Sequence, residues 1–125
     1  MGATYLSGCV DGEVLKILRL LSKREEKEIC GFILGDDSLS IIFPVENKAE
    51  NPRIEFYMDP HGILAAHRLA ENLGLEVKAI YHTHPKGSPE PSGKDLEGMK
   101  LWPMPWLIIG RHGYKMVSPS NHEGC

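Results

Sequence analysis

The chain has 125 residues, 42% of them hydrophobic, which suits one domain with a single core. Its 17 acidic and 14 basic residues give a formal charge of -3, so no broad cationic surface is expected for nucleic acid. No apolar run approaches the ~20 residues that span a bilayer, and the N-terminus lacks the pattern of a signal peptide. We therefore expect a single cytoplasmic domain over residues 1–125 that binds neither nucleic acid nor a membrane.

The three cysteines, Cys9, Cys30 and Cys125, lie at wide and irregular spacings, with no C-x-x-C pair. An odd number without paired spacing argues against a disulfide framework and against a zinc knuckle. Cys30 lies within an apolar run. It is interpreted as a small buried hydrophobe or, alternatively, as a thiol that modulates a nearby site.

The first half of the chain predicts a helix, a β-hairpin and a third strand. Apolar residues recur at helical spacing over residues 11–22, after the favourable N-cap residue Asp11. Two short apolar runs, 29–35 and 39–45, flank a Gly-Asp-Asp turn and predict the hairpin. The apolar and aromatic residues of segment 54–58 then indicate another strand.

The second half alternates helices and strands. Asp59 and Pro60 suit an N-cap and a first helical position, and apolar periodicity continues from there to Leu73. Segment 75–81 follows as a buried strand, and the proline-rich segment 85–91 must be a loop. The remaining expected elements are a short helix from Ser92 to about Leu101, strands at 106–109 and 114–117, and a flexible tail over 118–125.

The H-T-H-P segment that begins at His82, followed by Ser92 and Asp95, carries the clearest chemical signal. Alternate side chains of a strand point to the same face, so His82 and His84 can present both imidazoles to one ion. Asp95, in the first turn of the next helix, could return to the same point as a third ligand. Two imidazoles and a carboxylate leave one tetrahedral position open, which is typical of catalytic rather than structural zinc.

Each of these residues also has an ordinary interpretation. An H-x-H pair alone is more often a pair of structural or surface histidines than a metal site, and Ser92 with Asp95 forms an S-x-x-D capping box. The combination at these spacings favours the metal interpretation. A capping role for Ser92 does not contradict it, because the cap fixes where the hydroxyl points. The other histidines match no motif and are interpreted as ordinary: His61, His67, His112 and His122.

Hydrolysis at such a site also needs a general base, and no H-E-x-x-H motif supplies one. Glu25, Glu26 and Glu28 precede the first predicted strand, and any of them could be a solvated surface charge. Glu28 directly abuts the apolar strand, where partial desolvation would raise its pKa. The residues alone leave the choice among these glutamates open.

The segment E-I-C-G-F-I-L-G that begins at Glu28, followed by H-T-H-P, six residues and S-x-x-D, resembles the JAMM/MPN-plus metalloprotease family. The resemblance implies that Glu28 is the general acid/base, that His82, His84 and Asp95 bind one zinc ion, and that Ser92 stabilises the oxyanion. It also implies an α/β domain of the cytidine-deaminase-like type. Its central, mostly antiparallel sheet would be packed by the first two helices, with the active site at one edge.

The implied reaction is hydrolysis of the amide or isopeptide bond after the C-terminal Gly-Gly of a ubiquitin-like modifier, as in deubiquitinases. The modifier's extended tail would add as a strand beside segment 54–58. One alternative is a peptidase that releases cysteine or another small amine from a sulfur-carrier protein. Another is a non-catalytic interaction module. The identity of the modifier and the oligomeric state, with a homodimer among the options, stay open.

Overall fold

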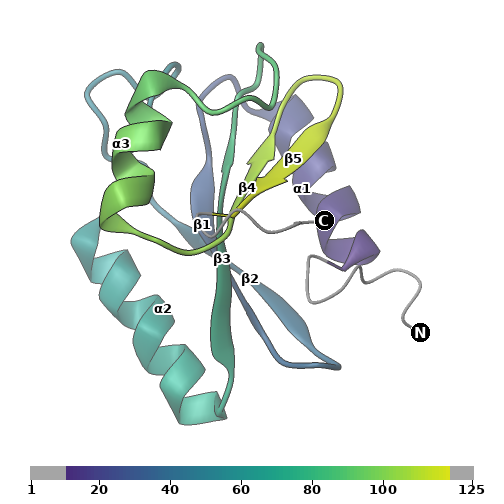
Figure 1. The fold of residues 1–125 in the computed structure, drawn as a ribbon, viewed down its shortest axis with the longest axis vertical. Helices are drawn as coiled ribbons and strands as arrows, with labels where there is room; N and C mark the ends of the chain where they lie inside the picture. The colour runs from purple at the N-terminus through teal and green to yellow at the C-terminus, as the bar shows by residue number, and fades with distance from the viewer. Residues whose placement is uncertain (1–10, 119–125) are drawn as a thin grey trace.

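The computed structural model describes residues 11–118, which fold around a five-stranded sheet with the strand order β2-β1-β3-β4-β5 (Figure 1). The elements are α1 (Gly12–Arg24), β1 (Cys30–Gly35), β2 (Ser40–Val45), α2 (Pro60–Leu73), β3 (Glu76–Thr83), α3 (Gly93–Leu101), β4 (Trp106–Ile109) and β5 (Tyr114–Val117). Neighbouring strands are antiparallel except β3 and β4, which are parallel. The expected α/β fold with a mostly antiparallel sheet is confirmed. Of the expected tail, only Ser118 lies within the described residues.

The helix ends follow the capping residues that the sequence predicts. The Asp11 carboxylate accepts a hydrogen bond from the Glu13 amide at 2.8 Å, and Asp59 accepts one from the His61 amide at 3.2 Å. Gly74 ends α2 in the left-handed conformation at φ 69°, which glycine adopts without steric cost. All three predicted helices are confirmed, although α1 extends beyond its expected end. None of the three has the length and apolar character needed to cross a membrane.

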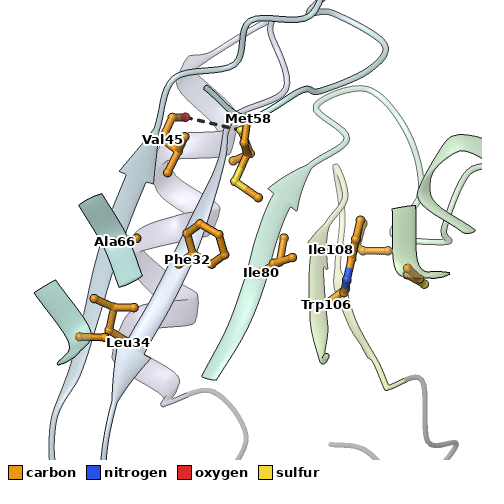
Figure 2. Close-up of a cluster of buried hydrophobic side chains, with 11 residues drawn as sticks. Phe32, Leu34, Val45, Met58, Ala66, Ile80, Trp106 and Ile108 are labelled. Atoms are coloured by element: carbon orange, nitrogen blue, oxygen red, sulfur yellow. Dashed lines mark hydrogen bonds between the residues drawn. The ribbon is translucent and has the colours of Figure 1, made fainter. Parts of the chain in front are cut away.

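Two hydrophobic clusters occupy the two faces of the sheet. On one face, α1 contributes Val14 and Leu18. On the other face, which α2 and α3 cover (Figure 1), α2 contributes Ala66 and Ala70, and α3 adds Met99. Figure 2 shows the second cluster, which includes Phe32, Leu34, Ile80, Trp106 and Ile108. The first two helices therefore pack the sheet as expected, with α3 completing the layer over one end of the α2 face.

Segment 54–58, predicted as a strand, is not one. Among residues 11–118, its only β-pairing is an isolated bridge between Met58 and Asn47. The Asn47 side chain takes the place of a partner strand, because its nitrogen donates to the Glu55 carbonyl and its oxygen accepts from the Tyr57 amide, both at 3.0 Å. The same nitrogen donates to the Glu28 carbonyl at 2.8 Å. The segment is thus held beside the start of β1 without a β-ladder.

Cys30 is a buried hydrophobe, as the first interpretation expected. Its side chain is 1% exposed, with the sulfur 3.5 Å from the Val45 carbonyl oxygen. Burial, and then the nearby Glu28 carboxylate, raise the pKa of its thiol to about 12. Thiolate chemistry is therefore suppressed at this position. Cys9 and Cys125 lie outside the described residues.

Gly31 provides a test of how tightly the central strands pack. A methyl group here would lie 2.3 Å from the Phe43 carbonyl oxygen and 2.8 Å from the Tyr81 ring. Because the backbone oxygen cannot move aside without disturbing the hairpin, we expect Gly31→Ala to lower the free energy of unfolding by about 1–3 kcal/mol in urea denaturation. Gly113→Ala is the control, since a methyl group there meets nothing within 4 Å. Equal losses in the two variants would contradict this account.

Candidate metal centre

The antiparallel register of β1 and β3 brings the two motif segments together. Cys30 lies opposite His82, so the register carries Glu28, two residues earlier, to the level of His84. Thr83 makes two hydrogen bonds with Ile29, which extend the pairing to the residue just before β1. Because side chains alternate along a strand, Glu28 and both histidines face the side covered by α3. β3 is the third of five strands, so the site lies at the end of the central strand. This position differs from the expected one, which was at one edge of the sheet.

Three donor atoms converge at this point. The Nε2 atoms of His82 and His84 and the Oδ2 atom of Asp95 lie 3.1 Å from one another. His82 and Asp95 are buried, and His84 is partly buried. Glu28, which is also buried, forms with the two histidines a group whose donor atoms lie within 4.8 Å of one another and that could hold a metal ion. The structure thus brings four of the five predicted site residues together.

The fifth, Ser92, forms the predicted capping box with Asp95 at the start of α3. The Ser92 hydroxyl accepts a hydrogen bond from the Asp95 amide at 3.0 Å, and Asp95 Oδ2 accepts one from the Ser92 amide at 2.9 Å. Oδ2 is also the oxygen that faces the two imidazoles, so the box orients this carboxylate as well as capping the helix. Capping and metal binding do not compete, because a carboxylate oxygen has two lone pairs.

The environment of each group sets its charge. Burial alone would raise the pKa of Asp95, but its contacts with His82 and His84 outweigh burial and hold that pKa below its usual range, so the carboxylate is ionised. Burial lowers the pKa of His82 and favours the neutral ring, whereas the Asp95 contact raises the pKa of His84. Burial also raises the pKa of Glu28 to about 7. A carboxyl group with such a pKa can both accept and return a proton near neutral pH.

The three converging atoms fit a tetrahedral metal ion. His84 Nδ1 lies 2.8 Å from the Ser88 carbonyl oxygen, which places the proton on Nδ1 and a lone pair on Nε2. With neutral His82 and ionised Asp95, three polar atoms meet at 3.1 Å, and one proton can bridge only one pair of them. Tetrahedral zinc with bonds of about 2.0–2.2 Å keeps its ligands about 3.3 Å apart. This mixed nitrogen and oxygen set suits zinc better than magnesium or calcium.

Two aromatic rings hold His82 in place. Phe56 stacks on the imidazole with 4.4 Å between ring centroids, and Trp106 meets it edge-on at 5.7 Å. The Nδ1 atom is buried and has no hydrogen-bond partner among residues 11–118, so packing fixes the orientation of the ring. The sequence analysis missed this role of Phe56. The only available signal was an aromatic residue in a segment that was interpreted as a strand.

A cleft of about 310 Å³ opens beside the three donor atoms, on the face of the sheet that α2 and α3 cover. Its walls include Phe56, Trp102 and Trp106, and its polar rim includes Ser92 and Asp95. We call it the apolar cleft. It offers space for a narrow, extended chain next to the donor atoms.

The other described histidines take no part in the donor cluster. His61 is exposed at the start of α2, and His67 packs edge-on against Phe32. His112 lies in the β4–β5 turn, and His122 lies outside the described residues. The interpretation of these residues as ordinary stays a prediction.

Comparison with known proteins identifies the family. The family model for prokaryotic homologs of the JAB domain matches residues 12–121. A desampylase of Pyrococcus furiosus is 44% identical over 99 residues, which are 78% of this chain and 69% of the relative. A probable TtuB-protein conjugate cleaving protease of Thermus thermophilus is 33% identical over 104 residues, 82% of this chain and 70% of the relative.

A solution structure of a protein from Desulfitobacterium hafniense has the same fold, with a TM-score of 0.65 and 20% identity over 85% of this chain and 86% of the other. The chain belongs to the family of prokaryotic JAB-domain homologs. This confirms the resemblance to the JAMM/MPN metalloproteases that the motif indicated.

Metal analysis tests the three converging ligands. We expect His82→Ala, His84→Ala and Asp95→Ala each to lose zinc, because two remaining ligands hold the ion too weakly to survive dialysis. The wild-type protein should keep about one ion per chain, measured by inductively coupled plasma mass spectrometry after zinc loading. His61→Ala is the control, since its side chain is 95% exposed and lies outside the cluster. Full occupancy in a variant would remove the substituted residue from the ligand set.

Proposed function

We propose that this chain is a zinc-dependent isopeptidase that hydrolyses the amide bond after the C-terminal Gly-Gly of a ubiquitin-like modifier. The observation that carries the proposal is the convergence of His82, His84 and Asp95 at 3.1 Å beside the buried Glu28. The relatives named as a desampylase and as a conjugate cleaving protease support the substrate class. We assign the three converging residues as metal ligands, Glu28 as general acid/base and Ser92 as the oxyanion donor.

Glu28, and not Asp95, suits the proton-transfer role. Asp95 is ionised, and its Oδ2 atom is occupied by the Ser92 amide and faces both imidazoles at 3.1 Å. Glu28 has a pKa of about 7, and its carboxylate makes no hydrogen bond to any group within 11–118. A bound zinc ion would supply Lewis acidity, polarising the scissile carbonyl and acidifying water. Glu28 then accepts the proton of the attacking water and passes it to the leaving amine.

Ser92 is placed to stabilise negative charge on the carbonyl oxygen. Its hydroxyl oxygen accepts a hydrogen bond from the Asp95 amide, which leaves the hydroxyl proton free to be donated elsewhere. The residue also lies on the rim of the apolar cleft. A substrate carbonyl that enters from this cleft can therefore accept a hydrogen bond from Ser92, and this bond strengthens as the oxyanion develops.

The apolar cleft offers the modifier's tail a position beside segment 54–58, whose residues from Glu55 to Met58 line it. Asn47 already bonds the Glu55 carbonyl and the Tyr57 amide, and the Tyr57 carbonyl accepts from a backbone amide at 2.7 Å. The amide and carbonyl of Phe56, which alternate with these bonded groups, make no hydrogen bond within residues 11–118, so an extended tail can pair there. We propose that the tail crosses the apolar cleft along this segment and passes Ser92. Glycines would allow its backbone to approach the donor atoms closely.

The leaving group in this proposal is the side chain of a lysine on a conjugated protein. Release of cysteine or another small amine from a sulfur-carrier protein would use the same residues. The two reactions differ only in the amine that acts as the leaving group. A cytoplasmic location is part of the proposal, and the free, buried thiol of Cys30 supports it.

Ser92→Ala separates the two roles of this residue. We expect kcat to fall by about 10²-fold, since one oxyanion donor is lost. Zinc should stay bound because the Ser92 backbone amide, which orients Asp95 Oδ2 at 2.9 Å, is unchanged. Loss of the helix cap should also lower the free energy of unfolding by about 1 kcal/mol. The measurements are kcat, zinc content and urea denaturation, and a rate that fell only in proportion to the unfolded fraction would reduce Ser92 to a cap.

Glu28→Gln tests the proposed reaction directly. Zinc-loaded wild-type protein should cleave conjugates of candidate ubiquitin-like modifiers to products identified by mass spectrometry. Glutamine keeps the shape of Glu28 but cannot accept a proton, so kcat should fall by about 10²-fold or more with zinc retained. The wild-type kcat/KM should decline as the pH falls through about 7 or somewhat lower, because Glu28 becomes protonated and a bound cation would lower its pKa. This acid limb should be absent from the variant.

Stability and an exposed control complete the test. Burial raises the pKa of Glu28 from 4.5 to about 7, so the folded chain holds this proton more tightly than the unfolded chain does. The resulting stabilisation of the fold is lost as the pH rises through this range. Glu28→Gln should therefore stay folded at pH values above neutral. Glu13→Gln, at the exposed start of α1, should cleave conjugates at the wild-type rate. Wild-type rates from zinc-loaded Glu28→Gln would overturn the mechanism even if the metal site proved real.

A further inference from the structure

A second cleft, of about 570 Å³, lies at the same end of the sheet but on the α1 side. It is lined by residues of the C-terminal end of α1, the start of the β3–α3 loop and the β4–β5 turn. Figure 1 shows these three segments at one end of the molecule. We call it the basic cleft, because five cationic side chains line it: Arg19, Lys23, Arg24, Lys86 and Arg111.

The cations of the basic cleft have no anionic partners of their own. Within residues 11–118, no ion pair involves any of the five. The cleft also contains Glu25 and Glu26, but Glu26 is bound at 3.1 Å to Arg53, which lies outside the lining. The lining thus holds five cations against two carboxylates, a local excess of positive charge in a chain whose formal charge is -3. Such a surface attracts an anionic ligand.

The basic cleft begins beside the proposed catalytic residues. Pro85 and Lys86, which line it, directly follow His84 in the chain. The Arg111 amide donates to the Gly87 carbonyl at 2.8 Å, which ties the β4–β5 turn to this loop. The basic cleft and the apolar cleft share no lining residue. A substrate that crosses the donor atoms can therefore place its two halves in two different clefts.

We propose that the basic cleft binds acidic residues that flank the modified lysine of the conjugated protein. This inference rests on the proposed isopeptidase function, in which the modifier's tail occupies the apolar cleft and the lysine leaves on the other side. Carboxylates near the lysine meet the five cations, so conjugates in acidic surroundings are the favoured substrates. A nucleic acid fits less well, because its phosphates recur at every nucleotide, whereas a peptide can present carboxylates to the cations and neutral or cationic side chains to Glu25 and Glu26.

Peptide binding tests the basic cleft without requiring cleavage. The probes are a fluorescein-labelled peptide with glutamates on both sides of a lysine and the same peptide with glutamines. Fluorescence anisotropy with the zinc-loaded full chain at low salt should show at least about tenfold tighter binding of the glutamate peptide, weakening with added sodium chloride. Lys86→Gln/Arg111→Gln should weaken its binding at least about fivefold, since two partly screened charges are removed. The charge-matched control, Arg68→Gln/Lys100→Gln on α2 and α3, should bind like the wild type.

Three outcomes would overturn the proposal. Equal weakening in the two double variants would assign the attraction to net charge, and equal binding of the two peptides would show no preference for carboxylates. Stronger displacement of the probe by an oligonucleotide than by the unlabelled glutamate peptide would assign the cleft to nucleic acid. Binding that depends on Lys86 and Arg111 in a protein that cleaves no conjugate would support the acidic-peptide site while contradicting the proposed function.

Discussion

The pairing of β1 with β3 is the constraint on which the site depends. Because Cys30 lies opposite His82, the strand that carries Glu28 delivers it to the level of His84. A slip of one residue would turn both histidines toward α1 and separate them from Asp95. The register shift between these strands lies at their far end, next to Ile33, where it adjusts packing and leaves the paired ends at the site undisturbed.

Local contacts fix the rest of the centre before any ligand arrives. The capping box holds the Asp95 carboxylate, and the Ser88 carbonyl holds the ring of His84. The loop between β3 and α3 is also pressed against the end of β4, where a methyl group on Gly110 would lie 2.6 Å from the Pro89 nitrogen. Side chains held in this way lose little further freedom when a metal or substrate binds, which favours both binding and catalysis.

Elements with strong local signals could be predicted from sequence. The caps at Asp59 and Gly74 define α2, and the strand period places His82 and His84 on one face. Segment 54–58 could not be predicted, because Phe56 and Met58 serve the core and the His82 ring while the Asn47 side chain provides the backbone partner. Nor could local sequence place the site at the sheet centre or choose Glu28 from its neighbours. Both depend on strand pairing between distant parts of the chain.

The four hydrogen bonds of Asn47 make the site depend on one amide side chain outside the catalytic motif. Its nitrogen donates to the carbonyls of Glu28 and Glu55, and its oxygen accepts from the amides of Ala49 and Tyr57. Aspartate in its place would keep the shape but set a negatively charged oxygen against two carbonyl oxygens. This one exchange of nitrogen for oxygen, with no loss of any catalytic side chain, would then loosen both the backbone of the proposed base and a wall of the apolar cleft.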